Sequence, residues 1–270
     1  MPEGDSIHSI AGALAPVLVG RPLTRVWVRD AGDVARLVGA TVDVVEAVGK
    51  HLLVGIGGTH VLRIHLGMRG GVRRWEPEAV WMRWDTSAIL ATAEDAFVWR
   101  LARTVEIVRA REHRALRVLE HVGPDLIADA CDVAELVVRA RALAGPDTPL
   151  VDVLLDQRIA AGIGNVYKSE VLFLLGLHPT TTLAVVGDAT LSRAYELARE
   201  LLRANVGPGR RDTITTVDPR TRIHPGQRRW VYRRRARACH RCGARIEMVR
   251  LGRDARSTYY CPNCQAVADP

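Results

Sequence analysis

Residues 239–264 read CHRCGARIEMVRLGRDARSTYYCPNC, and this stretch decides how the C-terminal end of the chain folds. It contains two Cys-x-x-Cys pairs separated by eighteen residues, a spacing typical of a closed tetrahedral zinc site. The expected ligands are Cys239, Cys242, Cys261 and Cys264. Because protein fills all four positions, the Zn²⁺ ion is structural and His240 is not needed as a ligand. The residues between the pairs are expected to form a β-hairpin.

The sequence around these cysteines is strongly basic. From Arg203 to Arg256 there are sixteen arginines and four acidic residues, in a chain with a net charge of +8. Such an excess is typical of a surface that binds a polyanion, with a merely solvated cationic surface as the alternative. Only Lys50 and Lys168 are lysines. These two positions either need a compact ammonium group or are lysine by chance.

The preceding segment has a helical apolar period. A first helical stretch is expected at 114–121, ending at a Gly123-Pro124 linker. Further helices are expected at 133–143, 150–160, 166–175 and 188–203, with caps at Asp132, Thr148 and Asp188. The turn Gly162-Ile163-Gly164-Asn165 would present backbone N–H groups and an amide to a phosphate, although an ordinary helix C-cap looks similar. A long loop, 207–227, follows, and its length suggests a functional role.

Residues 22–108 have short β-rich runs between glycine or charged turns, a pattern typical of a β-sandwich or barrel. The expected strands are 23–28, 41–48, 51–56, 60–66, 80–85, 87–92, 96–99 and 105–108. Lys50 lies at a strand junction, where it is either a functional side chain or a solvated turn residue. Met68 lies in the glycine-flanked tip 67–71, from which it could wedge into a base stack or fold back onto the sheet.

The chain begins Met1-Pro2-Glu3-Gly4-Asp5, and Asp5 is expected to cap a helix that Gly20 ends. Removal of Met1 would leave Pro2 with a free secondary amine. An N-terminal amine has a lower pKa than a lysine, so more of it is uncharged near neutral pH. Attack of this amine on a sugar C1′ gives a permanently cationic iminium that favours elimination, and Glu3 is a candidate proton donor or acceptor. The alternative is an inert terminus.

Composition places few other limits on function. The chain has 270 residues, of which 48% are hydrophobic and 25% charged, as in ordinary globular proteins. Neither a run of 18 uncharged apolar residues nor a signal-peptide pattern is found, so a cytoplasmic protein without a membrane span is expected. The fifth cysteine, Cys131, is expected to be buried.

Taken in order, these motifs resemble those of the formamidopyrimidine-DNA glycosylase and endonuclease VIII family along the whole chain. The matching segments are MPEG, GKHLLV around Lys50, HLGMRG around Met68, GIGNVYKSE around Asn165, and the four cysteines with RSTYYC at 256–261. The resemblance implies an α+β protein with three parts. They are an N-terminal β-sandwich catalytic domain with a flanking helix (1–122), a helix-two-turn-helix DNA-binding domain (125–227) and a zinc-finger hairpin (228–270).

The resemblance also implies a role for each candidate residue. Pro2 would attack C1′ of a damaged nucleotide in duplex DNA, and Glu3 would help to open the sugar. Phosphates around the flipped nucleotide would be held by Lys50, Asn165 and Arg256. Met68 would fill the space that the base leaves. The products would be the free base and, after β- and δ-elimination, a one-nucleotide gap, made by a monomer associated with the nucleoid.

Two departures from the family's pattern matter for the substrate, and the second of them, together with the MPEGD opening, looks closer to the endonuclease VIII branch. Ser6 stands where the family usually has a second glutamate, and no clear Arg-Arg-Phe-Gly loop is found near 112–117. We therefore expect oxidised pyrimidines, rather than 8-oxoguanine, as substrates. Two alternatives remain: a non-catalytic zinc-containing nucleic-acid-binding protein, and an enzyme in which Lys50 supplies the reactive amine.

Overall fold

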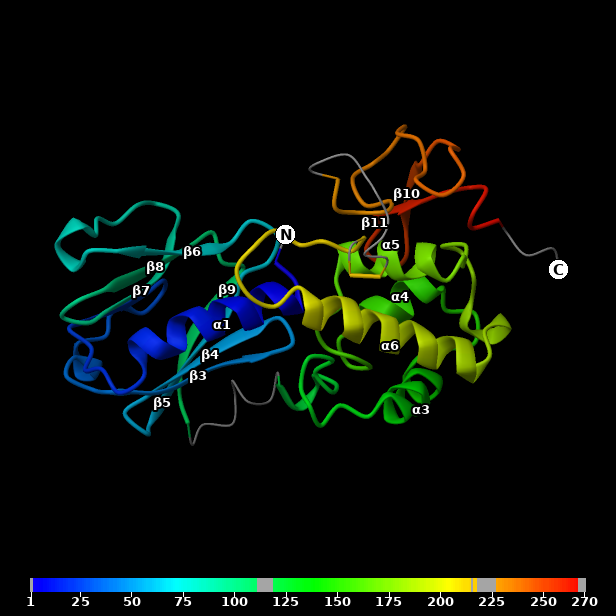
Figure 1. Ribbon diagram of the computed structural model, residues 1–270. Helices are drawn as coiled ribbons and strands as arrows, with labels where there is room; N and C mark the ends of the chain where they lie inside the picture. Colours follow the sequence, from blue (N-terminus) through cyan, green and yellow to red (C-terminus); the bar gives the residue numbers. More distant parts are fainter. Residues whose placement is uncertain (1, 111–118, 215, 218–226, 267–270) are drawn as a thin grey trace. The chain divides into compact units, whose positions relative to one another are not determined.

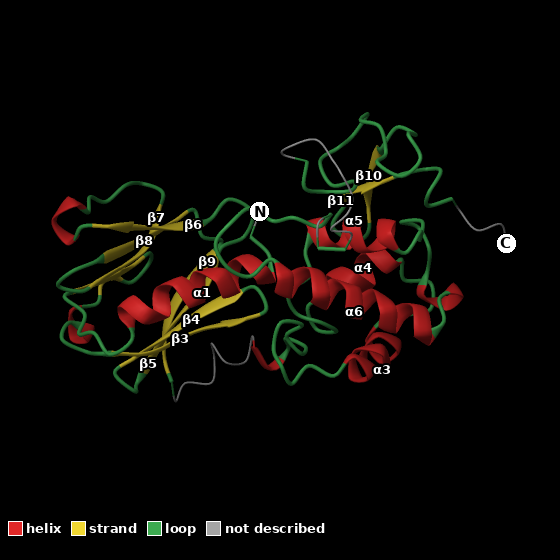
Figure 2. Cartoon of the chain, in the orientation of Figure 1, coloured by secondary structure: helices red, strands yellow, loops and turns green. Residues whose placement is uncertain are grey.

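The computed structural model describes residues 2–110, 119–214, 216–217 and 227–266. The chain divides into two units, Met1–His121 and Val122–Pro270. Figures 1 and 2 show the first as sheets with one long helix, and the second as helices with a small hairpin. The helix expected at 114–121 and the region in which the Arg-Arg-Phe-Gly loop was sought fall mainly on 111–118, outside the described residues.

The first unit contains two antiparallel sheets and helix α1 (Gly4–Leu18). One sheet has the order β2-β1-β7-β8-β6, and the other has the order β3-β4-β5-β9. The strands are β1 (Arg25–Val28), β2 (Gly32–Asp33), β3 (Val42–Val48), β4 (His51–Ile56), β5 (His60–His65), β6 (Gly71–Trp75), β7 (Thr86–Ala91), β8 (Ala96–Arg100) and β9 (Thr104–Arg109). Single 3-10 turns occur at η1 (Ala35–Leu37) and η2 (Pro77–Ala79).

One apolar core joins these elements. Ile7 and Leu14 of α1, Val54 of β4, and Leu90 and Trp99 of β7 and β8 are at most 4% exposed and belong to one cluster. Apolar residues of α1 recur at helical spacing and face the core, whereas each strand contributes the side chains of its inner face. The predicted β-sandwich with a flanking helix is confirmed.

Several local predictions for this unit are wrong. Residues 80–85 form no strand, and the apolar Trp81 and Trp84 are 57% and 86% exposed. The strand in this region is β6, which pairs with β8 at the edge of its sheet and is mostly solvent-facing, so it lacks an apolar alternation. The N-cap of α1 is Glu3, not Asp5, which lies buried inside the first turn.

The second unit consists of α3 (Val133–Leu143), α4 (Leu150–Leu155), α5 (Asn165–Leu174), α6 (Asp188–Ala204), the turn η3 (Leu183–Val185), and the hairpin of β10 (Glu247–Leu251) and β11 (Arg256–Tyr260). The buried Tyr167, Leu172, Tyr195 and Leu201 belong to its helical core. A smaller cluster around Phe173 and Trp230 includes Cys239 and Cys261. Cys131 is buried, as expected. The predicted helical domain and hairpin are confirmed.

The helix ends of this unit agree only in part with the sequence signals. The Asp132 carboxylate caps α3 by accepting the Ala134 N–H at 2.9 Å, as predicted. The caps predicted at Thr148 and Asp188 are wrong, because the N-caps are Pro149 and Gly187. Asp188 instead pairs with Arg141 at 2.8 Å. Helix α4 stops five residues before the predicted end at 160, since the residues after Leu155 form the turns that lead into α5.

None of the described helices is long and apolar enough to cross a bilayer.

Candidate active site and phosphate contacts

The N-terminal residues lead directly into α1. The backbone carbonyl of Glu3 accepts hydrogen bonds from the N–H groups of Ser6 and Ile7 at 3.0 and 3.2 Å, which starts the helix. The Glu3 side chain is fully buried, whereas Pro2 remains partly exposed. Helix α1 packs against β3 and β4. The fold therefore holds the segment in front of α1 in place and leaves Pro2 accessible.

Lys50 lies in the tight turn between β3 and β4. Gly49 has a φ of 57°, a left-handed conformation that glycine adopts without steric cost. The turn thus joins two strands whose register pairs Val48 with His51. Lys50 is partly exposed at the end of this hairpin.

Two histidines close to Lys50 are held in the neutral state. His51 and His65 are directly opposite each other in β4 and β5, with ring centroids 5.0 Å apart. Burial lowers the pKa of His51 to about 3 and that of His65 to about 4, and the positive charge of Lys50 adds to both shifts. An Arg63 guanidinium nitrogen lies 3.2 Å from His51 Nδ1. Because arginine only donates, Nδ1 is the acceptor. With both histidines neutral, the positive charge beside them comes from Lys50 and from neighbouring arginines such as Arg103.

Met68 projects into solvent from the turn that follows β5. Its side chain is 69% exposed, so the alternative in which it folds back onto the sheet is wrong. The turn needs its glycines: a Cβ on Gly70 would lie 2.3 Å from the Leu66 carbonyl oxygen, and one on Gly67 would lie 2.8 Å from Arg103 Cβ. The backbone therefore presents an exposed apolar side chain beside the cation of Arg69.

Asn165 is the first residue of α5 and follows the two glycine turns. The Gln157 side chain braces these turns, because its amide donates to the carbonyls of Leu155 and Ile163 at 2.8 and 3.0 Å and its oxygen accepts from Gly162 N–H at 3.1 Å. Gly162 itself has a φ of 113°. Sequence reasoning missed Gln157, because it placed residue 157 inside a helix at 150–160, whereas α4 ends at Leu155.

Lys168 holds the Asn165 amide in one orientation. Its ammonium group is completely buried and donates to Asn165 Oδ1 at 3.2 Å, to the Ser257 carbonyl at 3.3 Å and to Thr258 Oγ1 at 2.7 Å. With its oxygen facing Lys168, the Asn165 amide turns its Nδ2 towards Ser257 Oγ, 3.5 Å away. Lys168 was noticed in the sequence only because lysine is scarce, and two of its three partners, Ser257 and Thr258, lie on a strand far along the chain.

Arg256 is the first residue of β11 and directly precedes Ser257. Its guanidinium binds Asp254, with nitrogen–oxygen distances of 2.8 and 3.0 Å. An ion pair this exposed contributes little to stability, so a phosphate can compete for the guanidinium. The structure therefore brings Asn165 and the Arg256 segment together within the second unit, through Ser257 and Lys168.

The remaining candidates lie in the first unit on three separate elements: Pro2 and Glu3 at the start of α1, Lys50 in the β3–β4 turn, and Met68 after β5.

The four predicted zinc ligands converge. Their Sγ atoms all lie within 4.8 Å of one another, with 3.9 Å between Cys239 and Cys264 and 3.4 Å between Cys242 and Cys261. Tetrahedral Zn–S bonds of about 2.3 Å place sulfurs about 3.8 Å apart, close to the separations found here, so the four cysteines fit one Zn²⁺ ion. The ion would be structural, because protein sulfurs occupy every coordination position.

Comparison with known proteins agrees with this geometry along the whole chain. The formamidopyrimidine-DNA glycosylase N-terminal domain matches residues 1–118, the formamidopyrimidine-DNA glycosylase H2TH domain matches 122–217, and the zinc finger found in FPG and IleRS matches 238–267. The chain belongs to the formamidopyrimidine-DNA glycosylase and endonuclease VIII family. The predicted family, the fold class and a single structural zinc are thereby confirmed.

Relatives place the chain on the endonuclease VIII side of this family. It is 37% identical to the probable endonuclease 8 2 of Streptomyces coelicolor, covering 100% of this chain and 96% of that protein. It is 36% identical to the DNA-(apurinic or apyrimidinic site) lyase Nei2 of Mycolicibacterium smegmatis, over 99% and 100% of the two chains. A formamidopyrimidine-DNA glycosylase of Rhizorhabdus wittichii is 32% identical over 98% of this chain and 100% of that protein.

Among solved structures, the formamidopyrimidine-DNA glycosylase of Lactococcus lactis bound to AP-site DNA superposes with a TM-score of 0.80. The match covers 98% of this chain and 100% of that one at 20% identity, and it shows a shared fold. Family membership confirms the predicted enzyme class, a DNA glycosylase with AP lyase activity in base-excision repair.

Removing the metal is expected to disorder the hairpin and the apolar cluster beside it, because Cys239 and Cys261 pack with Phe173 and Trp230. Purified protein should contain one zinc per chain, and thiol modification should release it together with a change in Trp230 fluorescence. Cys261→Ser should lose the metal, whereas the matched control Cys131→Ser should keep it. Full zinc content in Cys261→Ser would contradict the assignment.

Lys168→Met is expected to weaken DNA binding about 10-fold, roughly 1.4 kcal/mol, because the Asn165 amide loses the donor that orients it. Zinc content should not change. Equilibrium binding of Lys168→Met, Asn165→Ala and the double variant forms a double-mutant cycle. If Lys168 acts through Asn165, the double variant binds no more weakly than Asn165→Ala. Additive losses would show that the two residues act separately.

Proposed function

We propose that this chain removes oxidised pyrimidines from DNA and cleaves the strand at the resulting site through an iminium on Pro2. The observation that carries the proposal is the N-terminal arrangement: an accessible Pro2 directly precedes a buried Glu3 at the start of a packed helix. The relative in Mycolicibacterium smegmatis, whose match covers 99% of this chain, is named a lyase of apurinic or apyrimidinic sites.

The proposed chemistry begins when the free Pro2 nitrogen forms a bond to C1′ of the damaged nucleotide. The glycosidic bond breaks, and the base leaves with a proton. Glu3, in its protonated form, gives a proton to the ring oxygen O4′ as the C1′–O4′ bond breaks and the nitrogen lone pair forms the iminium. The resulting iminium withdraws electrons, so first the 3′ and then the 5′ phosphate is eliminated. Water then adds to the remaining iminium, the C–N bond breaks, and Pro2 is released as a free secondary amine together with an unsaturated aldehyde.

Phosphate binding in this proposal involves both units. Lys50 supplies a charge in the first unit, beside histidines that burial keeps neutral. Asn165 and Arg256 supply donors in the second unit. Met68, exposed at its turn, fills the space that the extruded base leaves. In this proposal the protein is a monomer, its substrate is damaged duplex DNA, and it is associated with the nucleoid.

Pyrimidine preference is supported by the MPEGD opening, by the lack of a clear Arg-Arg-Phe-Gly motif in the sequence near 112–117, and by the relatives named endonuclease 8. A panel of duplexes containing 5-hydroxycytosine, thymine glycol, 8-oxoguanine or an abasic site tests this preference. The proposal expects faster single-turnover excision of the two pyrimidines than of 8-oxoguanine. The opposite ranking would overturn the preference and leave the lyase chemistry untouched.

Borohydride trapping tests the nucleophile. Wild-type protein incubated with an abasic duplex should form a covalent complex, because the iminium is reduced to a stable amine. Pro2→Gly should reduce the yield at least about 10-fold, and chemical acetylation of the N-terminus should abolish it, because an amide nitrogen is not nucleophilic. Zinc content serves as the control for folding.

Lys50→Ala separates the proposal from the alternative in which lysine is the amine. It should weaken DNA binding but still trap at saturating protein. Loss of trapping at saturation in Lys50→Ala, with normal trapping by Pro2→Gly, would contradict the proposal. Tight DNA binding without any trapped complex would favour a non-catalytic nucleic-acid-binding protein.

A further inference from the structure

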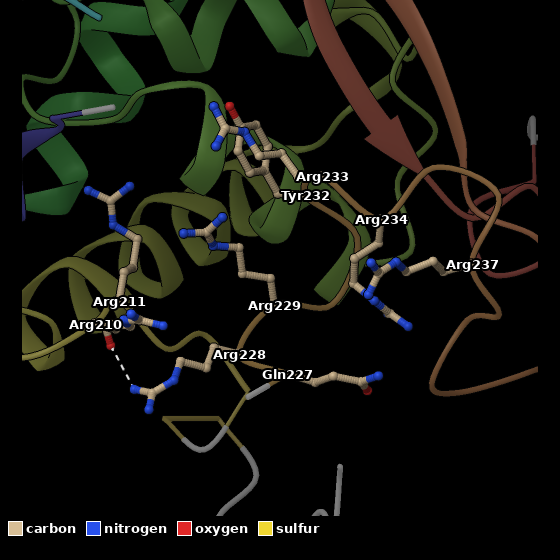
Figure 3. A pocket seen from close by; sticks show the side chains of 9 residues that line it. All are labelled: Arg210, Arg211, Gln227, Arg228, Arg229, Tyr232, Arg233, Arg234 and Arg237. Carbon is tan, nitrogen blue, oxygen red and sulfur yellow. Dashed lines mark hydrogen bonds between the residues drawn. The ribbon is translucent and has the colours of Figure 1, made fainter. Parts of the chain in front are cut away.

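The second unit contains an arginine pocket outside the site described above. It is lined by Arg210, Arg211, Gln227, Arg228, Arg229, Tyr232, Arg233, Arg234 and Arg237 and has a volume of about 350 Å³. Figure 3 shows these side chains entering from two segments, 210–211 and 227–237. The segments are tied together, because Thr213 N–H donates to the Arg228 carbonyl at 2.8 Å and Arg228 donates to the Arg210 carbonyl at 3.3 Å.

The charge of this pocket has one sign. Seven of its nine lining residues are arginines, and none of the lining residues that the structure describes is acidic. Like charges gathered in one concavity repel one another and focus a positive potential there. An ordinary surface intersperses both signs, so this arrangement favours an anionic ligand.

Buried donors in the pocket lack partners. Arg234 is 7% exposed, and two of its nitrogens donate to the carbonyls of Trp230 and Ala238. Its Nε is buried without a hydrogen-bond partner, and the same holds for Arg229 Nε. A buried donor without a partner is costly, and an acceptor ligand would remove that cost. Burial also lowers the pKa of the Arg234 guanidinium, an effect that a bound anion would oppose.

Aromatic rings hold several of the guanidinium groups. The Arg229 and Arg233 groups lie over the Tyr232 ring at 5.6 and 5.9 Å from its centroid, and Arg211 lies over Tyr167 at 4.9 Å. Stacking leaves the edge donors of each guanidinium available for in-plane hydrogen bonds. The side chains are thus pre-ordered for a ligand with several acceptor oxygens.

The backbone at the pocket is also unusual. Arg233 has a φ of 59° and Ala236 a φ of 63°, conformations that favour glycine. Strain of this kind persists where the surrounding structure imposes it, and it is concentrated at ligand sites. Here it places a large cation on Tyr232 at a position where glycine would relax the chain.

Ring contacts connect the pocket to the predicted phosphate contacts of the same unit. Tyr232 packs against Tyr259 of β11, with centroids 5.1 Å apart, and Tyr259 follows Arg256 by three residues. On the other side, Arg211 stacks on Tyr167, two residues after Asn165. Through these rings the pocket is connected to the two segments that carry Asn165 and Arg256.

We propose that this arginine pocket is a second phosphate-binding site, which takes phosphates of the nucleic-acid strand outside the nucleotide at the catalytic site. Guanidinium groups bind phosphate oxygens through paired hydrogen bonds. The volume is roughly ten times the ~30 Å³ that a water molecule occupies in the liquid, which leaves room for phosphate groups with some of their water. The strand assignment rests on the proposed function, whereas the phosphate chemistry does not.

The test uses two matched double variants of the full chain. Arg229→Gln with Arg233→Gln removes two pocket cations that stack on Tyr232. Arg193→Gln with Arg235→Gln removes two charges from exposed arginines of the same unit that do not line the pocket. Both pairs lower the net charge equally. Zinc content and melting temperature, measured for each, identify a folding defect, and Arg233→Gln alone serves as a milder variant.

Binding of undamaged single-stranded and duplex DNA is measured by fluorescence anisotropy between 50 and 200 mM NaCl. Each phosphate contact contributes about 0.9 to the slope of log K against log salt for duplex DNA and about 0.7 for a single strand. The pocket pair should therefore lose about 1.4 to 1.8 from the slope, with affinity about 10-fold lower at low salt. The control pair should lose less than half as much.

A second arm measures pyrophosphate binding by calorimetry, which separates a strand phosphate from a free one. A smaller salt slope for DNA binding in the pocket pair, but not in the control pair, supports binding of strand phosphates. If the salt slope is unchanged and pyrophosphate binding is lost only in the pocket pair, the assignment to a nucleic-acid strand is wrong, while the phosphate site itself is retained. Equal slope losses in both pairs, with no pyrophosphate binding, overturn the proposal.

The result is separable from the proposed function, because undamaged DNA needs no catalysis. At saturating protein the control pair, Arg193→Gln with Arg235→Gln, should still form the borohydride-trapped complex as fast as wild type. Absence of trapping in the wild type would reject the proposed chemistry while leaving the pocket result intact. A normal trapping rate with an unchanged salt slope would reject the strand assignment alone.

Discussion

Two buried charges on α5 hold the second unit together around Asn165 and Arg256, its proposed phosphate contacts. Lys168 donates to Asn165 on its own helix and to Ser257 and Thr258 of β11. Glu170, one half-turn further on, accepts the N–H groups of Trp230, Val231 and Tyr232 at 2.8 to 3.0 Å, as well as the Thr213 hydroxyl. Both side chains are completely buried, so removing either partner would leave an uncompensated polar group.

These bonds make α5 the common support of three features. The helix begins with Asn165, its lysine fixes the strand that carries Arg256, and its glutamate fixes the segment that carries the arginine pocket. The zinc-binding cysteines also contact this helix, because Cys239 and Cys261 pack with Phe173 of α5. A ligand that carries several phosphates therefore meets hydrogen-bond donors whose positions are already fixed. This reduces the loss of conformational entropy on binding.

Local signals were sufficient for part of this arrangement. The spacing of the four cysteines identified the metal ligands, and the bounds of β4 agree with the prediction because its apolar run is bounded by clear turn residues. The edge strand β6 was missed because its side chains face solvent, and Asp188 was misassigned because its carboxylate pairs with Arg141 instead of capping α6. In both cases tertiary contacts outweighed the local propensity.

The arginine pocket and the partners of Lys168 depend on contacts between segments that are far apart in the chain. Such contacts cannot be predicted from local patterns in a single sequence. The sequence showed that arginines are abundant after residue 203, but their gathering into a pocket requires the bond between Thr213 and Arg228 and the Tyr232 ring. Likewise, the scarcity of lysine drew attention to Lys168 without indicating Thr258 as its partner. Cationic character was predictable, and its concentration at particular places was not.

The central claim is that the nitrogen at the start of α1 forms the covalent bond to DNA. Peptide mapping by mass spectrometry of the borohydride-reduced complex locates that bond directly. The account predicts a nucleotide-derived mass on the N-terminal peptide, with fragmentation placing it on the Pro2 nitrogen. A mass on the peptide containing Lys50 or Lys168, with an unmodified Pro2, would contradict it.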